Sequence, residues 1–477
     1  MNLVKLSFDP LTTFILEQLE EDIMFNQSFM WGAATASYQI EGGAYDDGKG
    51  LSVWDMFTKV EGKVYNMDHG DVACDSYHKL EEDVSLLKEL GVKAYRFSIS
   101  WPRVLPNGIG EVSAKGLDYY SRFVDALLEA GIEPYVTLFH WDYPYELYKK
   151  GQWLNDASSD WFADYTKVMV DCLGDRVKHW MTLNEPQCFI GLGYFSGVHA
   201  PGHHYSAFDI IRMTHNTLLA HGKSLKVIKD AQPEASVGFA FVANAVVPKS
   251  LEQADVDAAR DFMFNRYEKT ENKDNYDFTF DNDYWYDPIM LGKYPEWVTK
   301  MYRDYLPEEN QLREDLKLIS QKVDFMGLNL YQGPVIEANG PYVKVSAQKP
   351  GQPFTALNWL VSEGIMYWGT KFMYERYQTP IYITENGLSN KDWVSLDGKV
   401  HDEGRIDFLD RYLRQLDKSY QEGIDIRGYF QWSLMDNFEW AEGYKERFGL
   451  VHVDFETGKR TPKESYYWYK NLIASKK

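Results

Sequence analysis

The chain has few cysteines: three in 477 residues, with no two of them close together in sequence. The spacing of Cys74, Cys172 and Cys188 supports neither a disulfide framework nor a zinc ribbon. A protein without structural disulfides is typical of a reducing compartment, so we expect a cytoplasmic location.

Positive charge is also scarce, because 50 Lys and Arg stand against 71 Asp and Glu and give a formal net charge of −21. A surface of that sign repels phosphate backbones and anionic lipids, so neither nucleic acid nor a membrane is an expected partner. The sequence contains no run of about 18 apolar residues that would suit a membrane span. It is compatible with either a monomer or a homo-oligomer.

The first 23 residues do not resemble a secretory signal peptide. Charged residues and a proline interrupt what would have to be the apolar core, and no small-residue cleavage site follows. Apolar side chains between residues 11 and 19 have helical spacing. We therefore expect residues 1–23 to form an N-terminal extension that is either an amphipathic helix or a disordered leader.

Aromatic residues, by contrast, are abundant, with 15 Trp, 34 Tyr and 26 Phe making up 16% of the chain. Most of them are expected to fill a core. Flat rings are also surfaces on which the apolar faces of sugars stack, so the composition raises a carbohydrate ligand as a hypothesis.

From Phe29 onward, short apolar runs alternate with longer stretches of 3.6-residue periodicity, which is the pattern of βα units around a parallel sheet. The expected strands are residues 30–36, 94–99, 134–139, 178–183, 236–242, 323–329, 380–384 and 427–432. Helical stripes lie between them, such as Tyr77, Leu80, Val84, Leu87 and Leu90 before Gly91. Eight strands followed by helical sequence, without a flexible linker, predict an α/β fold: a single (β/α)8 TIM barrel with long βα loops.

Two connections are expected to be loops. Residues 268–283, between the fifth and sixth strands, are polar and charged and predict an elaborate surface insertion. Residues 340–353 contain several Gly and Pro and predict a second loop.

Polar and aromatic side chains lie in or after nearly all of the expected strands, at the end of a barrel where chemistry gathers. They are Tyr38, Gln39, Glu41, Arg96, His140, Trp141, Asn184, Glu185, Asn329, Tyr331, Glu385, Trp432, Glu439 and Trp440. Groups that bind hydroxyls, together with aromatic faces, suit a hexose. The chain has no glycine-rich phosphate loop before a helix and no strand-end lysine placed for a Schiff base, so the rival chemistries of this fold are weakly supported.

Glu185 and Glu385 are the two carboxylates of greatest interest in this set. Each ends a short run of strand character, Glu185 before a proline and Glu385 before Asn386-Gly387. Strand ends that share one barrel mouth would bring the two into one cleft, an arrangement suited to splitting a glycosidic bond. Either short motif alone is more often an ordinary turn, and it is the joint occurrence at successive strand ends that favours a site.

Several longer motifs occur in order along the chain. They are FMWGAATASYQIEG (29–42), YRFSISWPR (95–103), HWD (140–142), TLNEP (182–186), HAPG (199–202), YITENG (382–387) and WSLMDNFEW (432–440). Together they resemble the family 1 glycoside hydrolases, the β-glucosidase family, from about Phe25 to the C-terminus. The resemblance implies a catalytic domain over residues 24–477 that hydrolyses terminal β-D-glucosyl residues of short β-glucosides such as cellobiose and aryl β-glucosides. Many relatives also accept β-galactosides or β-fucosides.

The same resemblance implies roles for individual residues. Glu385 would be the nucleophile of a retaining double displacement, and Glu185 the general acid and then the general base. Arg96, Tyr331 and Asn329 would support the two carboxylates. The substrate would contact Gln39, His140, Trp141, Asn184, Trp432, Glu439 and Trp440, with Trp359 as a platform for the leaving group and Phe448 in the wall. No metal or organic cofactor is expected, because two carboxylates suffice for this chemistry.

Two variants of the family are disfavoured by single residues. Glu439 would repel the phosphate of a 6-phospho-β-glycoside, and Glu185 stands where thioglucosidases have glutamine. Gln187-Cys188 follows Asn-Glu-Pro where the family often has tryptophan, a departure on the aglycone side. Two alternatives stay open: a non-catalytic sugar-binding relative, and an enzyme whose main reaction is transglycosylation.

Overall fold

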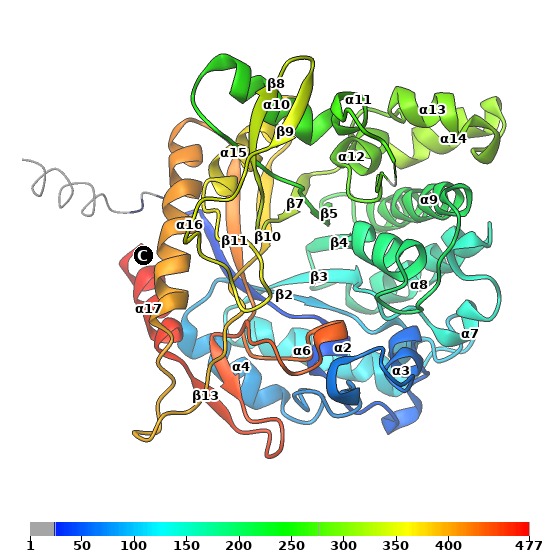
Figure 1. Cartoon of the computed structure of the whole chain (residues 1–477). Coiled ribbons are helices and arrows are strands. Elements are labelled where there is room, and N and C mark those ends of the chain that lie inside the picture. Colours follow the sequence, from blue (N-terminus) through cyan, green and yellow to red (C-terminus); the bar gives the residue numbers. More distant parts are fainter. Residues whose placement is uncertain (1–22, 24, 275, 477) are drawn as a thin grey trace, which may run out of the picture.

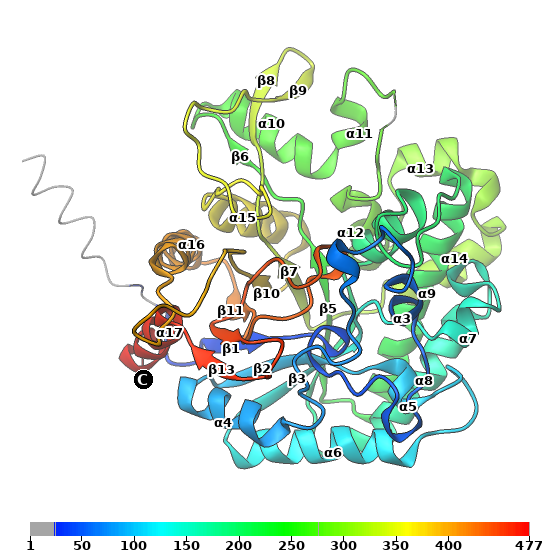
Figure 2. The ribbon, with the colours of Figure 1, turned by 60° about the horizontal axis from the view of Figure 1, so that its bottom comes forward.

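The structure, a computed structural model, describes residues 23, 25–274 and 276–476. The expected N-terminal extension, residues 1–23, lies outside the described residues except for Ile23. Figures 1 and 2 show a ring of helices around a central sheet, with long connections gathered at one end.

Eight parallel strands close into a barrel in the order β1-β11-β10-β7-β5-β4-β3-β2. They are β1 (Met30–Ala34), β2 (Ala94–Ser98), β3 (Glu133–Phe139), β4 (His179–Asn184), β5 (Ser236–Val242), β7 (Phe325–Asn329), β10 (Ile381–Asn386) and β11 (Ile426–Trp432). Each begins and ends within two residues of its expected range. The predicted single (β/α)8 barrel is therefore confirmed.

The strands read as apolar runs because both of their faces are buried, one against the outer helices and one inside the barrel. The interior is filled by a separate cluster that includes Tyr135, Met181, Phe325, Tyr382 and Phe430. The much larger cluster between sheet and helices contains most of the remaining buried apolar side chains. The barrel is thus a packed core, and only its C-terminal mouth is left for a site.

The outer ring consists of the longer helices. They are α4 (Leu80–Leu90), α6 (Ala114–Glu129), α8 (Ser158–Leu173), α9 (Ala207–Ala231), α14 (Glu309–Ile319), α15 (Ile365–Tyr377), α16 (Glu403–Gln421) and α17 (Glu464–Ser475). The expected stripe before Gly91 forms α4, which ends at Gly91 in the left-handed conformation with φ of 80°. The prediction was wrong for Tyr77, which lies outside the helix because α4 begins only at Leu80.

The connections contain further elements, most of which are short. They are α2 (Ser37–Ile40), η1 (Asp46–Gly48), α3 (Val53–Phe57), η2 (Tyr65–Met67), α5 (Trp101–Val104), α7 (Tyr145–Tyr148), η3 (Gln152–Leu154), η4 (Gln187–Phe195), β6 (Val247–Pro248), α10 (Gln253–Phe264), α11 (Arg266–Lys269), α12 (Asn282–Met290), α13 (Glu296–Met301), η5 (Arg303–Tyr305), β8 (Val335–Asn339), β9 (Tyr342–Val345), η6 (Trp440–Glu442), β12 (Val451–Val453) and β13 (Arg460–Pro462). None of the helices in the described part of the chain has the length and apolar character of a membrane span.

The expected surface insertion at residues 268–283 is only partly right. Its early part is exposed, but Phe278, Thr279 and Asp281 are buried where the segment runs into α12. Burial is tolerated because Arg266 Nε and the Tyr276 hydroxyl donate to the Asp281 carboxylate at 2.5 and 2.7 Å. The charged side chains here are paired with one another inside the protein. The sequence pattern alone does not distinguish such a segment from one that is exposed to solvent.

The expected loop at residues 340–353 also needs a correction. It contains β9, which pairs antiparallel with β8 through a turn at Gly340, a residue with φ of 62°. A glycine in the left-handed region makes this hairpin turn favourable. The loop predicted from the Gly and Pro content is therefore right only for the turn and for the residues after β9.

A buried ion network ties the connections after β10 and β11 to the outer helices. Lys463, just before α17, donates to Asp392 at 2.6 Å and to Asp436 at 2.7 Å. Arg405 on α16 pairs with the same Asp392 and, at 2.9 Å, with Asp402. Because Asp392 follows β10 and Asp436 follows β11, the network fixes the two connections that flank the barrel mouth.

Replacing Lys463 by Met is expected to destabilise the fold strongly. The change leaves two buried carboxylates with one cation fewer, which typically costs about 3–5 kcal/mol. The midpoint of thermal unfolding should therefore fall clearly below that of the native chain. Lys470→Met is the control, since Lys470 on α17 pairs with Glu89 at the surface and such pairs contribute about 1 kcal/mol or less. Equal midpoints for the two variants would contradict a supporting role for the network.

Candidate active site

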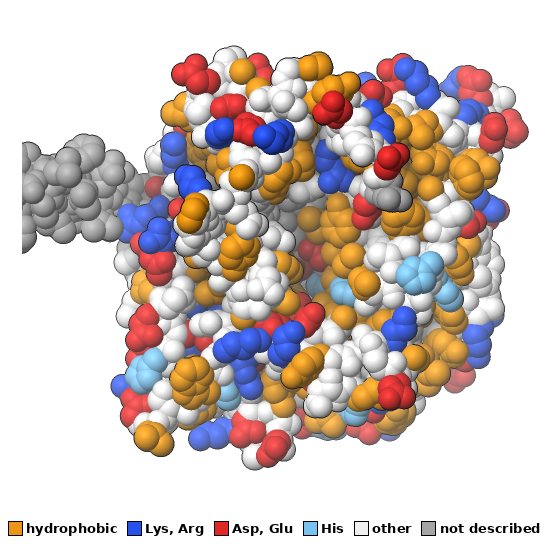
Figure 3. Space-filling model, viewed as in Figure 1, with side chains coloured by type: hydrophobic (Ala, Val, Ile, Leu, Met, Phe, Trp, Pro, Cys, Tyr) orange, Lys and Arg blue, Asp and Glu red, His pale blue; other side chains and the backbone are white. Residues whose placement is uncertain are grey.

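A cavity of about 530 Å³ opens at the C-terminal ends of the barrel strands, and the face in Figure 3 is hollowed near its middle. Eleven of the fourteen residues to which the family resemblance gives a role line it: His140, Trp141, Glu185, Asn329, Tyr331, Trp359, Glu385, Trp432, Glu439, Trp440 and Phe448. The other three, Gln39, Arg96 and Asn184, are fully buried and hydrogen-bond to residues of the lining. The structure thus gathers all fourteen in one place.

Glu385 lies in β10, at a shift in the register between β10 and β7. Arg96 Nη1, from β2, donates to Glu385 Oε1 at 2.5 Å, and the Tyr331 hydroxyl donates to Oε2 at 2.7 Å. Burial raises the pKa of the Glu385 carboxyl, while the charge of Arg96 and these hydrogen bonds oppose the rise. The carboxylate is therefore held in its ionised form by a cation in direct contact.

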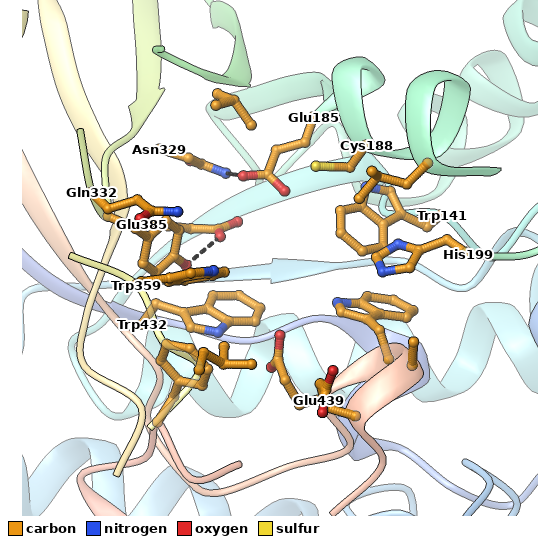
Figure 4. Close-up of a pocket in the computed structure, with 18 of the residues that line it drawn as sticks. Trp141, Glu185, Cys188, His199, Asn329, Gln332, Trp359, Glu385, Trp432 and Glu439 are labelled. Carbon is orange, nitrogen blue, oxygen red and sulfur yellow. Dashed lines mark hydrogen bonds between the residues drawn. The ribbon is translucent and has the colours of Figure 1, made fainter. Parts of the chain in front are cut away.

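Glu185 follows β4 directly and adopts φ of 44°, a left-handed conformation that few non-glycine residues take. Its backbone N–H donates to the Ala240 carbonyl at 2.8 Å, and Asn329 Nδ2 donates to its carboxyl Oε1 at 2.8 Å (Figure 4). Burial, and then the negative charge of Glu385, raise the pKa of Glu185 to about 8. The two carboxyls thus have unlike environments, and at neutral pH a shared proton belongs on Glu185.

A hydrogen-bond network joins the two carboxyls from behind. Arg96 Nη2 donates to Asn184 Oδ1 at 2.6 Å, and Asn329 Nδ2 approaches the same oxygen at 3.1 Å. The Asn184 amide meets His140 Nε2 at 3.0 Å. Burial, and then the charge of Arg96, lower the pKa of His140 well below its usual value, so the ring is neutral. Asn184 is therefore fixed from three sides.

The part of the pocket near the end of β11 combines aromatic rings with polar groups that lack partners. The His140 ring is nearly parallel to those of Trp432 and Trp440, with centroids 5.7 and 5.8 Å away. Gln39 Nε2 donates to the Phe438 carbonyl at 2.8 Å and lies 3.4 Å from Glu439 Oε2. Among the described residues, neither Gln39 Oε1 nor His140 Nδ1 has a hydrogen-bond partner although both atoms are buried. A ligand rich in hydroxyl groups would supply these partners.

The sequence profile of the family described as Glycosyl hydrolase family 1 matches residues 21–477. The chain belongs to glycosyl hydrolase family 1. It is 47% identical to beta-glucosidase A of Thermotoga maritima over 94% of this chain and 98% of the relative. It is 38% identical to a bifunctional beta-D-glucosidase/beta-D-fucosidase of Bifidobacterium breve over 95% and 98% of the two chains.

Solved structures agree with the family assignment. A family 1 β-glucosidase from Thermotoga maritima matches with a TM-score of 0.85 and 44% identity, over 95% of this chain and 98% of that one. The same enzyme in complex with glucoimidazole matches with a TM-score of 0.85 and 44% identity, over 95% and 99% of the two chains. The resemblance inferred from the sequence motifs is therefore confirmed.

The glycosyl hydrolase pocket has further lining residues that the sequence did not indicate as site residues. They are Cys188, Leu192, His199, Val242, Ala243, Asn244, Phe280, Gln332, Leu357, Ala441 and Glu442. Asn244 and Gln332 lie two and three residues after the ends of β5 and β7, so the strand-end rule could have found them. Phe280 comes from the buried part of residues 268–283, and no local pattern marks it.

Gln187 occupies the position at which the sequence departs from its family. It is 1% exposed, does not line the cavity, and donates through Nε2 to the Val242 carbonyl at 3.2 Å. The next residue, Cys188, lines the cavity instead. This turn therefore presents Cys188, and not Gln187, to the cavity.

One group in the described part of the chain has the spacing of a metal site. Ligand atoms of His401, Glu403 and Glu464 lie within 4.8 Å of one another near the start of α16 and α17. Both ring nitrogens of His401 already hydrogen-bond to carboxylates, at 2.7 Å to Glu464 and 3.0 Å to Asp397. None of these residues lines the glycosyl hydrolase pocket, and the expectation that catalysis needs no metal or cofactor stays a prediction.

Tyr331→Phe is expected to move the acid limb of the pH profile of glycoside hydrolysis to higher pH. The change removes the hydroxyl that donates to Glu385 and so raises the pKa of that carboxyl further, by about 1 unit for a hydrogen bond to a charged group. Because Glu385 has to be ionised to react, kcat/KM would then be lost at a higher pH as the pH falls. Tyr143→Phe is the matched control, since the buried Tyr143 hydroxyl has no partner among the described residues. An acid limb that is the same in all three proteins would contradict this account of Glu385.

Proposed function

We propose that the protein is a retaining β-glucosidase that removes terminal non-reducing β-D-glucosyl residues from short β-glucosides, including cellobiose and aryl β-glucosides. The observation that carries the proposal is the unlike environment of two carboxyls in one pocket: Glu385 contacts Arg96, whereas Glu185 contacts the neutral amide of Asn329. Such a pair supplies an ionised nucleophile and a protonated acid at the same pH. The names of the relatives support the choice of glucose as the sugar.

In the first half of the reaction, a Glu385 oxygen attacks the anomeric carbon while Glu185 gives its proton to the glycosidic oxygen. The bond to the leaving group breaks and a glucosyl ester of Glu385 forms. Arg96 and Tyr331 bind the attacking carboxylate and hold its oxygens in place. Asn184, fixed by Arg96 and Asn329, is assigned to the sugar 2-hydroxyl, where hydrogen bonds strengthen in the transition state.

In the second half, water attacks the same carbon from the side that the leaving group has vacated. Formation of the ester removes the negative charge of Glu385, which had raised the pKa of Glu185. The pKa of Glu185 therefore falls, and the carboxylate left by the first step stays ionised. It can then act as the base that takes a proton from the attacking water. Two inversions at the anomeric carbon give net retention.

Recognition of the glucosyl unit is assigned to the end of the pocket near β11. Gln39 Oε1 and His140 Nδ1 lack partners among the described residues and suit sugar hydroxyls. Glu439 adds a carboxyl, and Trp432 and Trp440 add aromatic faces. Trp359 and Phe448, whose ring centroids are 6.0 Å apart, are assigned to the adjoining wall beside Tyr331, where Trp359 would contact the leaving group.

The wider setting is part of the proposal. All three cysteines are free thiols, which fits the cytoplasm, and a role in using cellobiose would link the enzyme to cellulose degradation. Galactosides and fucosides are proposed as further substrates, because one relative is named for both β-D-glucosidase and β-D-fucosidase activity. The net charge of −21 disfavours nucleic acid as a partner.

Hydrolysis of a panel of nitrophenyl glycosides tests the proposal. The panel contains β-glucoside, β-galactoside, β-fucoside, 6-phospho-β-glucoside and α-glucoside, with cellobiose measured separately. We expect turnover of the β-glucoside, with no turnover of the α-anomer or the phosphorylated sugar. Sugar binding without turnover would favour the non-catalytic alternative, and a dominant glucosyl transfer to added alcohol would favour the transglycosidase.

Glu185→Ala is expected to separate substrates by their leaving groups. A dinitrophenolate leaves without a proton, so kcat/KM for its glucoside should fall about tenfold or less, whereas cellobiose should lose about 10²–10⁴-fold. Steady-state kinetics on both substrates measure the difference. Glu442→Ala serves as the control, because Glu442 also lines the pocket and should affect both substrates alike. Equal losses for the two substrates in Glu185→Ala would contradict the acid role.

Glu385→Gly is expected to abolish hydrolysis of dinitrophenyl β-glucoside and to restore turnover when azide is added. The small anion would occupy the space of the missing carboxylate and attack from that side, so the product is the α-glucosyl azide. Product analysis by NMR gives the configuration. The same treatment of Glu439→Gly should give no azide product, and a fully active Glu385→Gly protein would refute the nucleophile assignment.

A further inference from the structure

Cys188 lies three residues after Glu185 and is close to it through both its backbone and its side chain. The helix η4 begins directly after Pro186, and its first turn brings the Cys188 N–H to the Glu185 carbonyl at 2.9 Å. The Cys188 side chain reaches the same pocket, and Figure 4 shows its sulfur directed at the Glu185 carboxyl. Cys188 lines the cavity and is 8% exposed.

The thiol is the member of this pair that has a proton to donate to a carboxylate. Burial, and then the negative charge of Glu185, raise the pKa of the Cys188 thiol well above its usual value, so the group keeps its proton. Asn329 Nδ2 donates to Oε1 of the same carboxyl at 2.8 Å. The Glu185 carboxyl therefore lies between donor groups from two separate elements, an amide on β7 and a thiol on η4.

We propose that Cys188 is a positioning residue whose thiol holds the Glu185 carboxyl in the pocket and favours its ionised form. The inference rests on the proposed function, in which Glu185 is protonated before the first bond breaks and ionised before the second. A donor stabilises a carboxylate more than the neutral acid. The thiol therefore assists mainly the step in which Glu185 acts as a base.

That step needs no redox change at sulfur. The oxygen of water forms a bond to the anomeric carbon, and the bond from that carbon to Glu385 breaks with its electron pair returning to the Glu385 carboxylate. Glu185 takes a proton from the water. Cys188 keeps its own proton and is neither oxidised nor alkylated, so the enzyme regains its starting state once Glu385 is free.

Other titratable groups also surround Glu185. They are Glu385 on β10, Arg96 on β2, Tyr331 after β7, Glu439 after β11, Tyr286 on α12, and the pocket histidines His140 and His199. Burial lowers the pKa of both histidines, to about 4 for His199, which leaves their rings neutral near pH 7. These groups are unchanged when only Cys188 is replaced, so a change in the titration of Glu185 reports the thiol.

The test compares the native chain with Cys188→Val and Cys188→Ser. Valine fills a similar volume without a donor, whereas serine keeps one. A thiol is a weak donor, so its loss should raise the pKa of Glu185 by about 0.5 unit. In Cys188→Val, we expect the alkaline limb of kcat/KM to move up by this amount, because Glu185 stays protonated to higher pH. Cys188→Ser should return the limb towards its native position.

A second limb reports the base step. With dinitrophenyl β-glucoside as substrate, hydrolysis of the ester limits kcat, and the acid limb of kcat follows the ionisation of Glu185 in the intermediate. In Cys188→Val this limb should also move up, and kcat on the acid side should fall about threefold, which is the rate equivalent of 0.5 pH unit. Cys172→Ala, which removes a half-buried thiol on the outer helix α8, should move neither limb.

Unchanged limbs in Cys188→Val would overturn the proposal, whatever the absolute rates, because a purely structural role lowers rates without moving a titration. A direct measurement separates this outcome from failure of the proposed function. In protein with ¹³C-labelled glutamate carboxyls, the Glu185 signal is identified by its loss in Glu185→Gln, and its pKa is then compared in native chain and Cys188→Val. Absence of any glucoside turnover would count against the proposed function alone, whereas equal pKa values would count against the role of the thiol.

Discussion

The ion pair between Arg96 and Glu385 is the interaction on which the site depends. Arg96 is fully buried, and its guanidinium donates to Glu385, to the Thr384 carbonyl, to Thr137 and to Asn184. A buried cation without its carboxylate, or the reverse, would be strongly unfavourable, so each fixes the other in place. One arginine therefore keeps Glu385 ionised and also orients the amide that is assigned to the substrate.

The barrel brings these groups together although they are far apart in sequence. Arg96 and Glu385 are 289 residues apart, and β1 and β11 lie between their strands in the sheet. Closure of the sheet directs both side chains into one mouth. Close packing of the strand ends adds precision: a Cβ on Gly387 would lie 1.8 Å from the Trp432 carbonyl oxygen, so only glycine lets the end of β10 approach the end of β11 this closely. The buried ions around Lys463 then hold the connections that follow.

The difference between the two carboxyls follows from the same arrangement. Glu385 has a cation and a hydroxyl as hydrogen-bond partners, whereas Glu185 has an amide, with the Cys188 thiol directed at its carboxyl. Burial raises the pKa of both, but only Glu385 has a positive charge in direct contact. The proton is therefore assigned to Glu185 until Glu385 forms the glucosyl ester and loses its negative charge. A double displacement requires this order.

The sequence predicted the barrel because strands buried on both faces appear as continuous apolar runs and end at polar residues. The same rule indicated Glu185, Asn329 and Glu385, which lie at or next to strand ends. It did not indicate Phe280 or Leu357, because each comes from a long connection whose path depends on tertiary packing. It also misjudged Asp281, whose charge is satisfied by Arg266 rather than by water. Cys188 was visible as part of a departure from the family, but its contact with Glu185 depends on how η4 turns back.

The account depends most directly on a covalent bond between the sugar and Glu385. A 2-deoxy-2-fluoro-β-glucoside with a dinitrophenolate leaving group forms the ester but hydrolyses it slowly, because the fluorine destabilises the oxocarbenium-like transition state. Intact mass spectrometry followed by peptide mapping should show one fluoroglucosyl group on Glu385, and activity should return when an acceptor alcohol releases the sugar. Attachment to another residue, or complete inactivation without any covalent sugar, would contradict the central claim.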